Sequence, residues 1–174
     1  MSARAAWRLE ETLGFERVYR YTPGKADWLA AGLPFEGELA GMPRIGEVAD
    51  RDVPTCGPRQ RTGEVRRRLE RLGQDVCVVL NQRRVVLGLV RSQDLEGAPD
   101  VAVEDVMNPG PATYRPDTLL AEIVDYFQQR RGKVDRVLVT TADGELIGLV
   151  RHADAERILH ERHAEDATHE PHAA

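Results

Sequence analysis

The stretch Gly88-Leu-Val-Arg91-Ser-Gln-Asp94 occurs a second time as Gly148-Leu-Val-Arg151-His-Ala-Asp154, with the same glycine, leucine, valine, arginine and aspartate. The correspondence continues upstream of this stretch at a constant offset, apart from a short insertion near Arg131. It covers residues 45–95 and 103–158. A repeat of this length identifies the structural unit before any single motif does. We therefore predict one unit, present twice.

Each copy contains the same order of predicted elements. In the second copy Leu119, Leu120, Ile123, Val124 and Phe127 form the apolar stripe of an amphipathic helix, and in the first copy Val65, Leu69 and Leu72 do so. The predicted extended segments are Val53–Cys56 and Ala112–Tyr114, and the predicted strands are Val76–Leu80, Val85–Val90, Val137–Thr140 and Leu146–Val150. A short helix is expected after Ser92 and after His152.

One such unit leaves one face of its sheet bare, so two units must pack together to bury it. The predicted fold class is α+β: two β-α-β-β-α repeats related by a pseudo-twofold axis, with a small N-terminal α/β appendage. The predicted domains are 1–36 for the appendage, 37–44 for a linker, 45–98 and 99–160 for the two repeats, and 161–174 for a disordered tail.

Composition narrows the function classes. The net charge of −5 argues against a general nucleic-acid binder, and no apolar run is long enough to span a bilayer. Cys56 and Cys77 form no C-x-x-C pair, which predicts neither a zinc site nor a disulfide framework and favours a reducing, cytoplasmic compartment. The sequence contains no P-loop and no catalytic Ser/His/Asp motif. We therefore expect no enzyme.

The second copy has the clearer family likeness. Its motifs, in order, are Val103-Glu-Asp-Val-Met107, Thr113-x-x-Pro-Asp117 and Gly148-Leu-Val-x-x-x-Asp154. In this order they resemble the cystathionine-β-synthase-type (CBS) domain, a family that usually occurs as a tandem pair. The resemblance implies a regulatory module that often forms homodimers. It also implies that an adenosine-containing nucleotide binds between the repeats and signals through a conformational or assembly change.

The resemblance also implies roles for individual residues. In the family motif Gly-x-x-(Thr/Ser)-x-x-Asp, the aspartate accepts hydrogen bonds from ribose and the hydroxyl residue faces phosphate. The candidate ligand-binding residues are Asp94 and Asp154 for ribose, Arg91 and Arg151 at the hydroxyl position, and Thr55, Cys56, Thr113, Tyr114, Arg136 and Val137 on the strands that line the adenine pocket. The expected regulatory ligand is AMP, ADP, ATP or S-adenosylmethionine, with no required cofactor and no metal. The expected partners are a second copy and an unidentified regulated protein, without nucleic acid or membrane.

Arginine at the hydroxyl position departs from the family pattern and leaves two interpretations open. A guanidinium binds phosphate bidentately, which favours an anionic ligand. Alternatively, Arg91 and Arg151 fill the cleft, and the protein is a structural, dimerising one that binds no ligand. Asp94 and Asp154 also have an alternative role as helix caps. Simple core packing is the alternative for the strand residues.

The N-terminal segment has a separate likeness. A helix is expected over Ser2–Leu13, a strand over Arg17–Tyr21 and a second helix over Gly24–Ala31. The residues Gly14-Phe-Glu-Arg-Val-Tyr19 and Gly24-Lys-x-x-Trp28 resemble the C-terminal end of a rhodanese-type sulfurtransferase domain. The persulfide-carrying cysteine of that family would precede Ser2, so sulfurtransferase activity is not expected. We expect a relic that packs on the repeats, or a start codon assigned too far downstream.

Overall fold

The computed structural model describes residues 2–31, 33–34, 36–37, 40–130 and 132–169. The chain divides into two compact units, Met1–Phe35 and Glu36–Ala174. The first unit contains helix α1 (Ser2–Trp7), a π-helical turn η1 (Arg8–Thr12) and helix α2 (Lys25–Ala30). The second unit contains both sequence copies and has the predicted α+β architecture.

Each copy forms its own small sheet. In the first copy the elements are β1 (Thr55–Cys56), α4 (Thr62–Leu72), β2 (Val76–Leu80), β3 (Val86–Arg91) and the 3₁₀ turn η2 (Ser92–Leu95). The strand β4 (Asn108–Pro109), from the opening segment of the second copy, completes this sheet in the order β1-β2-β3-β4. In the second copy they are β5 (Thr113–Tyr114), α5 (Leu120–Gln129), β6 (Arg136–Thr140), β7 (Leu146–Arg151) and α6 (His152–His169), with order β5-β6-β7. The predicted repeat of elements is therefore confirmed.

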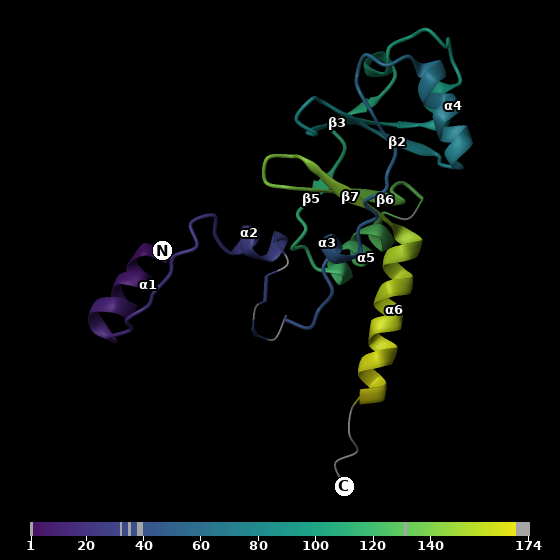
Figure 1. Ribbon diagram of the computed structural model, residues 1–174. Helices are drawn as coiled ribbons and strands as arrows, with labels where there is room; N and C mark the ends of the chain where they lie inside the picture. The colour runs from purple at the N-terminus through teal and green to yellow at the C-terminus, as the bar shows by residue number, and fades with distance from the viewer. Residues whose placement is uncertain (1, 32, 35, 38–39, 131, 170–174) are drawn as a thin grey trace. The chain divides into compact units, whose positions relative to one another are not determined.

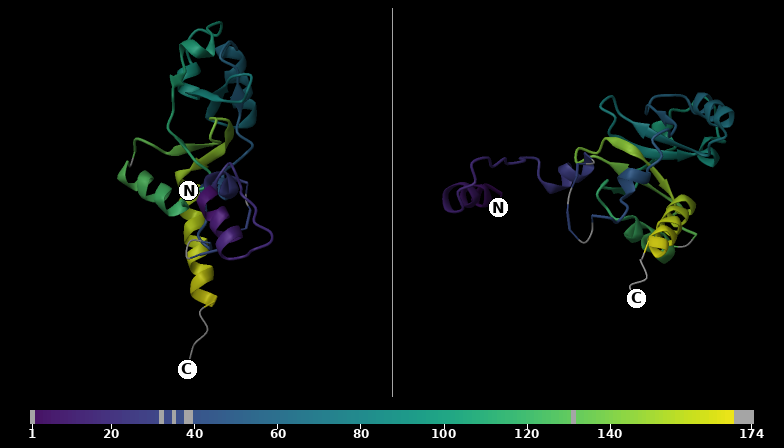
Figure 2. Two further views of the ribbon diagram at one scale, coloured as in Figure 1. Left: turned by 90° about the vertical axis from the view of Figure 1, so that its left-hand side faces the viewer. Right: turned by 60° about the horizontal axis from the view of Figure 1, so that its bottom comes forward.

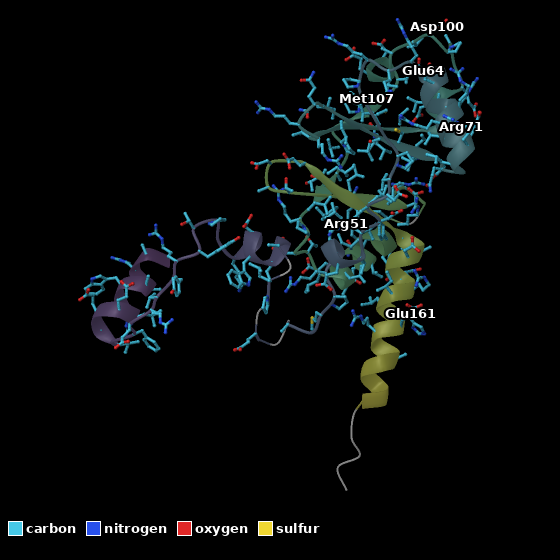
Figure 3. All side chains as sticks on the ribbon, in the orientation of Figure 1. Arg51, Glu64, Arg71, Asp100, Met107 and Glu161 are labelled. Atoms are coloured by element: carbon cyan, nitrogen blue, oxygen red, sulfur yellow. The ribbon has the colours of Figure 1, made fainter. Side chains whose placement is uncertain are left out.

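The two sheets face each other and are covered by helices on their outer sides. Val78 and Leu89 of the first sheet share a buried cluster with Leu138 and Leu149 of the second. Successive strand residues point to opposite faces, so alternate residues of the same strands pack under the helices instead. Figures 1 and 2 show the β2–β3 and β6–β7 hairpins side by side, and side chains fill the space between them (Figure 3).

The opening segment of each copy packs on the core of the other copy. Helix α3 (Ile45–Val48) opens the first copy, yet Ile45 is fully buried in the second copy's core beside Phe127. Reciprocally, Val103 opens the second copy in the turn η3 (Val103–Asp105) and is buried in the first copy's core beside Leu69. Each hydrophobic core therefore contains residues from both sequence copies.

Main-chain hydrogen bonds fix this exchange symmetrically. Gly46 N–H donates to the carbonyl of Pro116 at 3.0 Å, and Glu104 N–H donates to the carbonyl of Pro58 at 2.9 Å. The tips of the two hairpins are joined as well, because Leu146 N–H donates to the carbonyl of Arg84 at 3.0 Å. The repeats are thus connected through the backbone at several places.

Two expectations, for Leu72 and for residues 17–21, are wrong. Leu72 is 56% exposed instead of buried, because α4 ends there and Gly73 (φ 62°) turns the chain towards β2. Residues 17–21 are extended but form no strand, because the described part of the chain offers them no strand to pair with. Helix α6 extends over residues 161–169, which the sequence analysis assigned to the tail. Their alanines and glutamates favour helix, and Arg157 pairs with Glu161 at 3.2 Å.

The remaining residues of the predicted tail, 170–174, lie outside the described residues. No helix of the described chain is long and apolar enough to cross a membrane.

Candidate ligand site between the repeats

The two candidate ribose-binding aspartates lie where the closing helix of each copy begins. Asp94 Oδ2 accepts a hydrogen bond from the Arg91 backbone N–H at 2.8 Å, which caps the turn η2. Asp154 lies in the first turn of α6, where its Oδ1 is 3.5 Å from Nη2 of Arg157. Both side chains are only partly buried. Asp94 therefore caps the turn through Oδ2. Among the described residues, no hydrogen-bond donor to its other carboxylate oxygen, Oδ1, is found.

Each of the two arginines at the hydroxyl position pairs with a carboxylate from the other sequence copy. Arg91 ends β3, and its Nη2 is 3.7 Å from Oδ1 of Asp135. Arg151 ends β7; its Nη1 is 3.2 Å from Oδ2 of Asp50, and its Nη2 donates to Oε1 of Gln74 at 3.0 Å. The first pair is long and 44% of the Arg91 side chain is exposed. Of the two arginines, Arg91 is therefore the one held less firmly.

Arg136 is at the centre of the same cluster. Its Nη1 and Nη2 donate to both carboxylate oxygens of Asp75 at 3.0 and 2.6 Å, and its Nε and Nη2 donate to both oxygens of Asp135 at 3.0 and 2.6 Å. These hydrogen bonds hold the pKa of each carboxyl group below its usual value and raise the pKa of Arg136. Because all three guanidinium nitrogens are engaged, Arg136 joins the two repeats and is not available to a phosphate in this arrangement.

The cluster interrupts the symmetry of the two copies. Asp75 precedes β2 as Asp135 precedes β6, but the residue that follows is Val76 in one copy and Arg136 in the other. Three arginines (Arg91, Arg136 and Arg151) thereby meet three aspartates (Asp50, Asp75 and Asp135). The formal charges of this inter-repeat cluster balance.

The strand residues predicted to line a base differ strongly between the copies. In the second copy Tyr114 is partly buried, and its ring is 5.5 Å from that of Tyr126 in an edge-to-face arrangement. Burial and the neighbouring Tyr126 raise the pKa of the Tyr114 hydroxyl. Thr113 is exposed, whereas Val137 is 2% exposed and belongs to the core. Tyr114 is therefore the residue of this copy with a ring face available for stacking.

In the first copy a thiol pair occupies the equivalent region. Cys56 is buried beside Cys77, and Nη2 of Arg68 lies 3.8 Å from the Cys77 sulfur and donates to the Thr55 carbonyl at 2.7 Å. The hydrogen bond between the thiols raises the pKa of Cys56 and lowers that of Cys77. No aromatic ring is present at the positions equivalent to Tyr114 and Tyr126.

The predicted residues of the first copy fall into two places. Thr55 and Cys56 line a groove of about 970 Å³ with Arg59, Asn81 and Arg84, at the end of β2. Arg91 and Asp94 lie beside the opposite end of β2, because Arg91 pairs with Val76 in the antiparallel register. Asp50, Gln74, Asp75 and Asp135 were missed as site residues. The alignment of Asp75 with Asp135 between the copies was the signal that could have found two of them.

Comparisons with known proteins agree with this architecture. Residues 103–161 match the CBS domain family. The chain matches none of the curated protein sequences with which it was compared. Among solved structures it is similar to a putative acetoin utilization protein (AcuB) from Vibrio cholerae, with 20% identity, a TM-score of 0.64, and coverage of 75% of this chain and 99% of that one.

Two further structures contain adenine ligands. CBSX2 in complex with AMP shares 19% identity and a TM-score of 0.60, covering 68% of this chain and 97% of that one. The cytosolic domain of the Mg²⁺ channel MgtE in complex with ATP shares 21% identity and a TM-score of 0.61, covering 69% of this chain. This chain spans about half (51%) of that domain. At these identities the likeness establishes the fold alone: the chain has the fold of a CBS pair, and residues 103–161 are the part that matches the CBS domain family.

Proposed function

We propose, from the CBS-pair fold and the inter-repeat cluster, that this protein is a regulatory module that binds an adenosine-containing nucleotide between its repeats. The observation that carries the proposal is the position of Arg151 directly before the helix that contains Asp154. Arg151 supplies positive charge for phosphate, and the Asp154 carboxylate offers only acceptors, which suits the two hydroxyls of a ribose. Tyr114 supplies a ring for the base in the same copy.

Binding of such a ligand changes the arrangement of the repeats by replacing ion pairs within the inter-repeat cluster. A phosphate at Arg151 competes with Asp50, and a phosphate at Arg91 competes with Asp135. Arg91 joins the two repeats through Asp135, and Arg151 joins them through its hydrogen bond to Gln74. Loss of these contacts changes the relative free energy of different repeat arrangements. A ligand shifts such an equilibrium only by its differential affinity for the two states, and this competition provides that difference. We include homodimerisation, a cytoplasmic location and a regulated partner protein in the proposal.

A second function is favoured by one specific observation. Every arginine of the inter-repeat cluster already has a carboxylate partner, and the cluster is charge-balanced without any ligand. A structural, dimerising protein that binds no nucleotide has this same arrangement. The rhodanese relationship of residues 1–36 stays a prediction, and the cysteines of the described chain, Cys56 and Cys77, are both buried in the first repeat.

Calorimetric titration of the full chain with AMP, ADP, ATP and S-adenosylmethionine separates the two functions. The proposed function predicts binding of at least one ligand below millimolar concentration, weakened about tenfold or more in Asp154→Ala and in Arg151→Met. Arg162→Met is the matched control, because it removes an exposed arginine of the same helix that lies away from Asp154, and this variant should bind normally. Absence of binding by all four ligands supports the structural function instead. Binding that is as tight in Asp154→Ala as in the native chain rejects the proposed site at Asp154.

A further inference from the structure

The unit Met1–Phe35 exposes apolar side chains around an extended segment. Tyr19 is 85% exposed, and Trp7, Leu13 and Phe15 are each more than half exposed. None of the unit's residues with described side chains is buried. Units of fewer than about 40 residues rarely bury enough surface to be stable alone. This apolar surface is therefore a place where another polypeptide would add stability.

The backbone of residues 17–21 is unpaired on both sides within the described residues. Within the described residues, no backbone hydrogen bond is donated or accepted by this segment, although it contains no proline. An extended segment with unpaired N–H and C=O groups is a template for a further strand. Strand addition of this kind takes its affinity from main-chain hydrogen bonds and its specificity from side-chain pockets.

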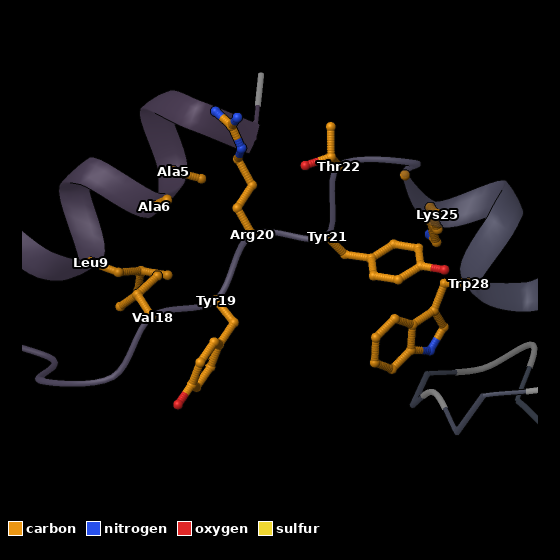
Figure 4. Close-up of a pocket in the computed structure, with 11 residues that line it drawn as sticks. Ala5, Ala6, Leu9, Val18, Tyr19, Arg20, Tyr21, Thr22, Lys25 and Trp28 are labelled. Carbon is orange, nitrogen blue, oxygen red and sulfur yellow. The ribbon is translucent and has the colours of Figure 1, made fainter.

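Beside the segment lies a groove of about 390 Å³ that offers such side-chain contacts. Its apolar lining comes from Ala5, Ala6 and Leu9 of the first helical stretch, from Val18 and Tyr21 of the segment, and from Trp28 of α2. In Figure 4 Val18 lies beside Leu9, whereas Tyr19 projects to the opposite side. The Tyr21 and Trp28 rings meet edge to face with centroids 5.1 Å apart. The groove therefore has one wall built from a helix and one from aromatic rings.

The charge of the groove indicates what kind of strand fits it. Its charged lining residues are Arg20 and Lys25, both cationic, and Arg17 lies in the same extended segment. The nearby Asp27 carboxylate already accepts a hydrogen bond from the Tyr21 hydroxyl, which raises the pKa of that hydroxyl. An incoming strand with acidic residues between apolar ones would place apolar side chains in the groove and carboxylates near the cations.

We infer that residues 17–21 form an open strand edge that binds an extended, acidic and partly apolar segment of another protein. This interaction surface is independent of nucleotide binding by the repeats. It gives the chain a docking site on a unit that the CBS-pair fold does not require.

Selection of displayed random linear peptides against the immobilised full chain tests the inference. The expected result is enrichment of peptides in which acidic and apolar residues alternate. Val18→Pro and Tyr19→Pro remove main-chain donors that point to opposite edges, and at least one of them should weaken binding about tenfold or more. Replacing both Arg20 and Lys25 by glutamate should turn the selection towards basic peptides, whereas Arg4→Glu, outside the groove, should not.

Three outcomes would overturn the inference. One is the absence of any enriched peptide, and another is binding of the enriched peptides to both proline variants as tightly as to the native chain. The third is a dimer of the full chain, seen by light scattering, that Val18→Pro converts to a monomer, because the occupant would then be a second copy. The changes lie in the compact unit Met1–Phe35, and the repeats belong to the other unit. The unfolding transition of the repeats should therefore be unchanged in every variant, and its measurement shows whether the repeats remain folded.

Discussion

Arg136 at the start of β6 forms a two-pronged ion pair with Asp75, which precedes β2, and so connects the two repeats at a point where each sheet begins. The arginine side chain is 11% exposed, whereas the Asp75 side chain is 61% exposed. Water therefore screens the carboxylate, and the pair is worth less than a buried one. Its main effect is to hold two carboxylates, Asp75 and Asp135, close together without repulsion.

We expect Arg136→Met to lower the free energy of unfolding by roughly 1–2 kcal/mol, because it leaves the two carboxylates facing each other with no cation between them. Urea denaturation measures the change. Arg157→Met removes ion pairs in which both partners are exposed and should cost less than about 0.5 kcal/mol. Equal losses in the two variants would show that Arg136 does not join the repeats in solution.

The same cluster predicts a pH dependence of stability. Arg136 lowers the pKa of Asp75 and Asp135 in the folded chain, so their stabilising contribution is complete above the unfolded pKa of about 3.9 and is lost as pH falls through the lower folded values. Asp75→Asn lacks the Asp75 part of this contribution. The stability difference between the native chain and Asp75→Asn should therefore be constant above about pH 5 and shrink below about pH 4. A difference that persists unchanged at pH 3 would contradict the assignment.

Gly88 and Gly148 occupy equivalent positions in the two copies, but we expect alanine to destabilise the protein more at one position than at the other. A Cβ on Gly148 would lie 2.5 Å from the Asp50 carbonyl oxygen, whereas a Cβ on Gly88 would lie 2.5 Å from the sulfur of Met107, a flexible side chain. We expect Gly148→Ala to cost about 1–3 kcal/mol and Gly88→Ala clearly less, because backbone yields less easily than a methionine side chain. The two midpoints of urea unfolding give the comparison, and the reverse order would be inconsistent with the packing of Asp50 on β7.

The exchanged opening segments predict that a mutation in one copy loosens the other. Ile45→Ala should cost about 2–4 kcal/mol and increase hydrogen exchange mainly in α5, β6 and β7, because the Ile45 side chain fills the second copy's core. Val103→Ala should act mainly on α4, β2 and β3. Hydrogen exchange followed by mass spectrometry resolves these segments. Increased exchange confined to each residue's own sequence copy would mean that the segments are not exchanged in solution.

Much of the fold follows from sequence because its signals are local. The apolar stripe through Ile123 and Phe127 and the repeated Gly-Leu-Val-Arg motif place helices and strands without knowledge of the partner repeat. The exchange of α3 is different, because the sequence places Ile45 at the start of the first copy but does not say which core buries it. Residues 17–21 differ from α3. Their local propensity correctly indicated an extended chain, but among the described residues no neighbouring strand pairs with them, so they form no strand.

The candidate site was predictable only in part for a related reason. Family likeness identified Asp94, Asp154 and the two arginines, which do lie at the ends of β3 and β7. It could not identify Asp75 and Asp135 as the residues that hold Arg136, because a hydrogen bond between repeats depends on where the second sheet lies. Cys56 and Val137 were predicted from strand position alone, and both face the interior.

The exchange of α3 and the segment around Val103 also limits how the module can be divided. A chain containing a single copy would carry the closing piece of a core that it does not possess, and would lack the piece that its own core needs. Two such chains could complete each other only by trading these pieces between molecules, at a cost that depends on concentration. Joining both copies in one polypeptide replaces that encounter by an intramolecular one with a high effective concentration. In the tandem chain, each copy therefore supplies the core segment that the other copy needs, without a second molecule.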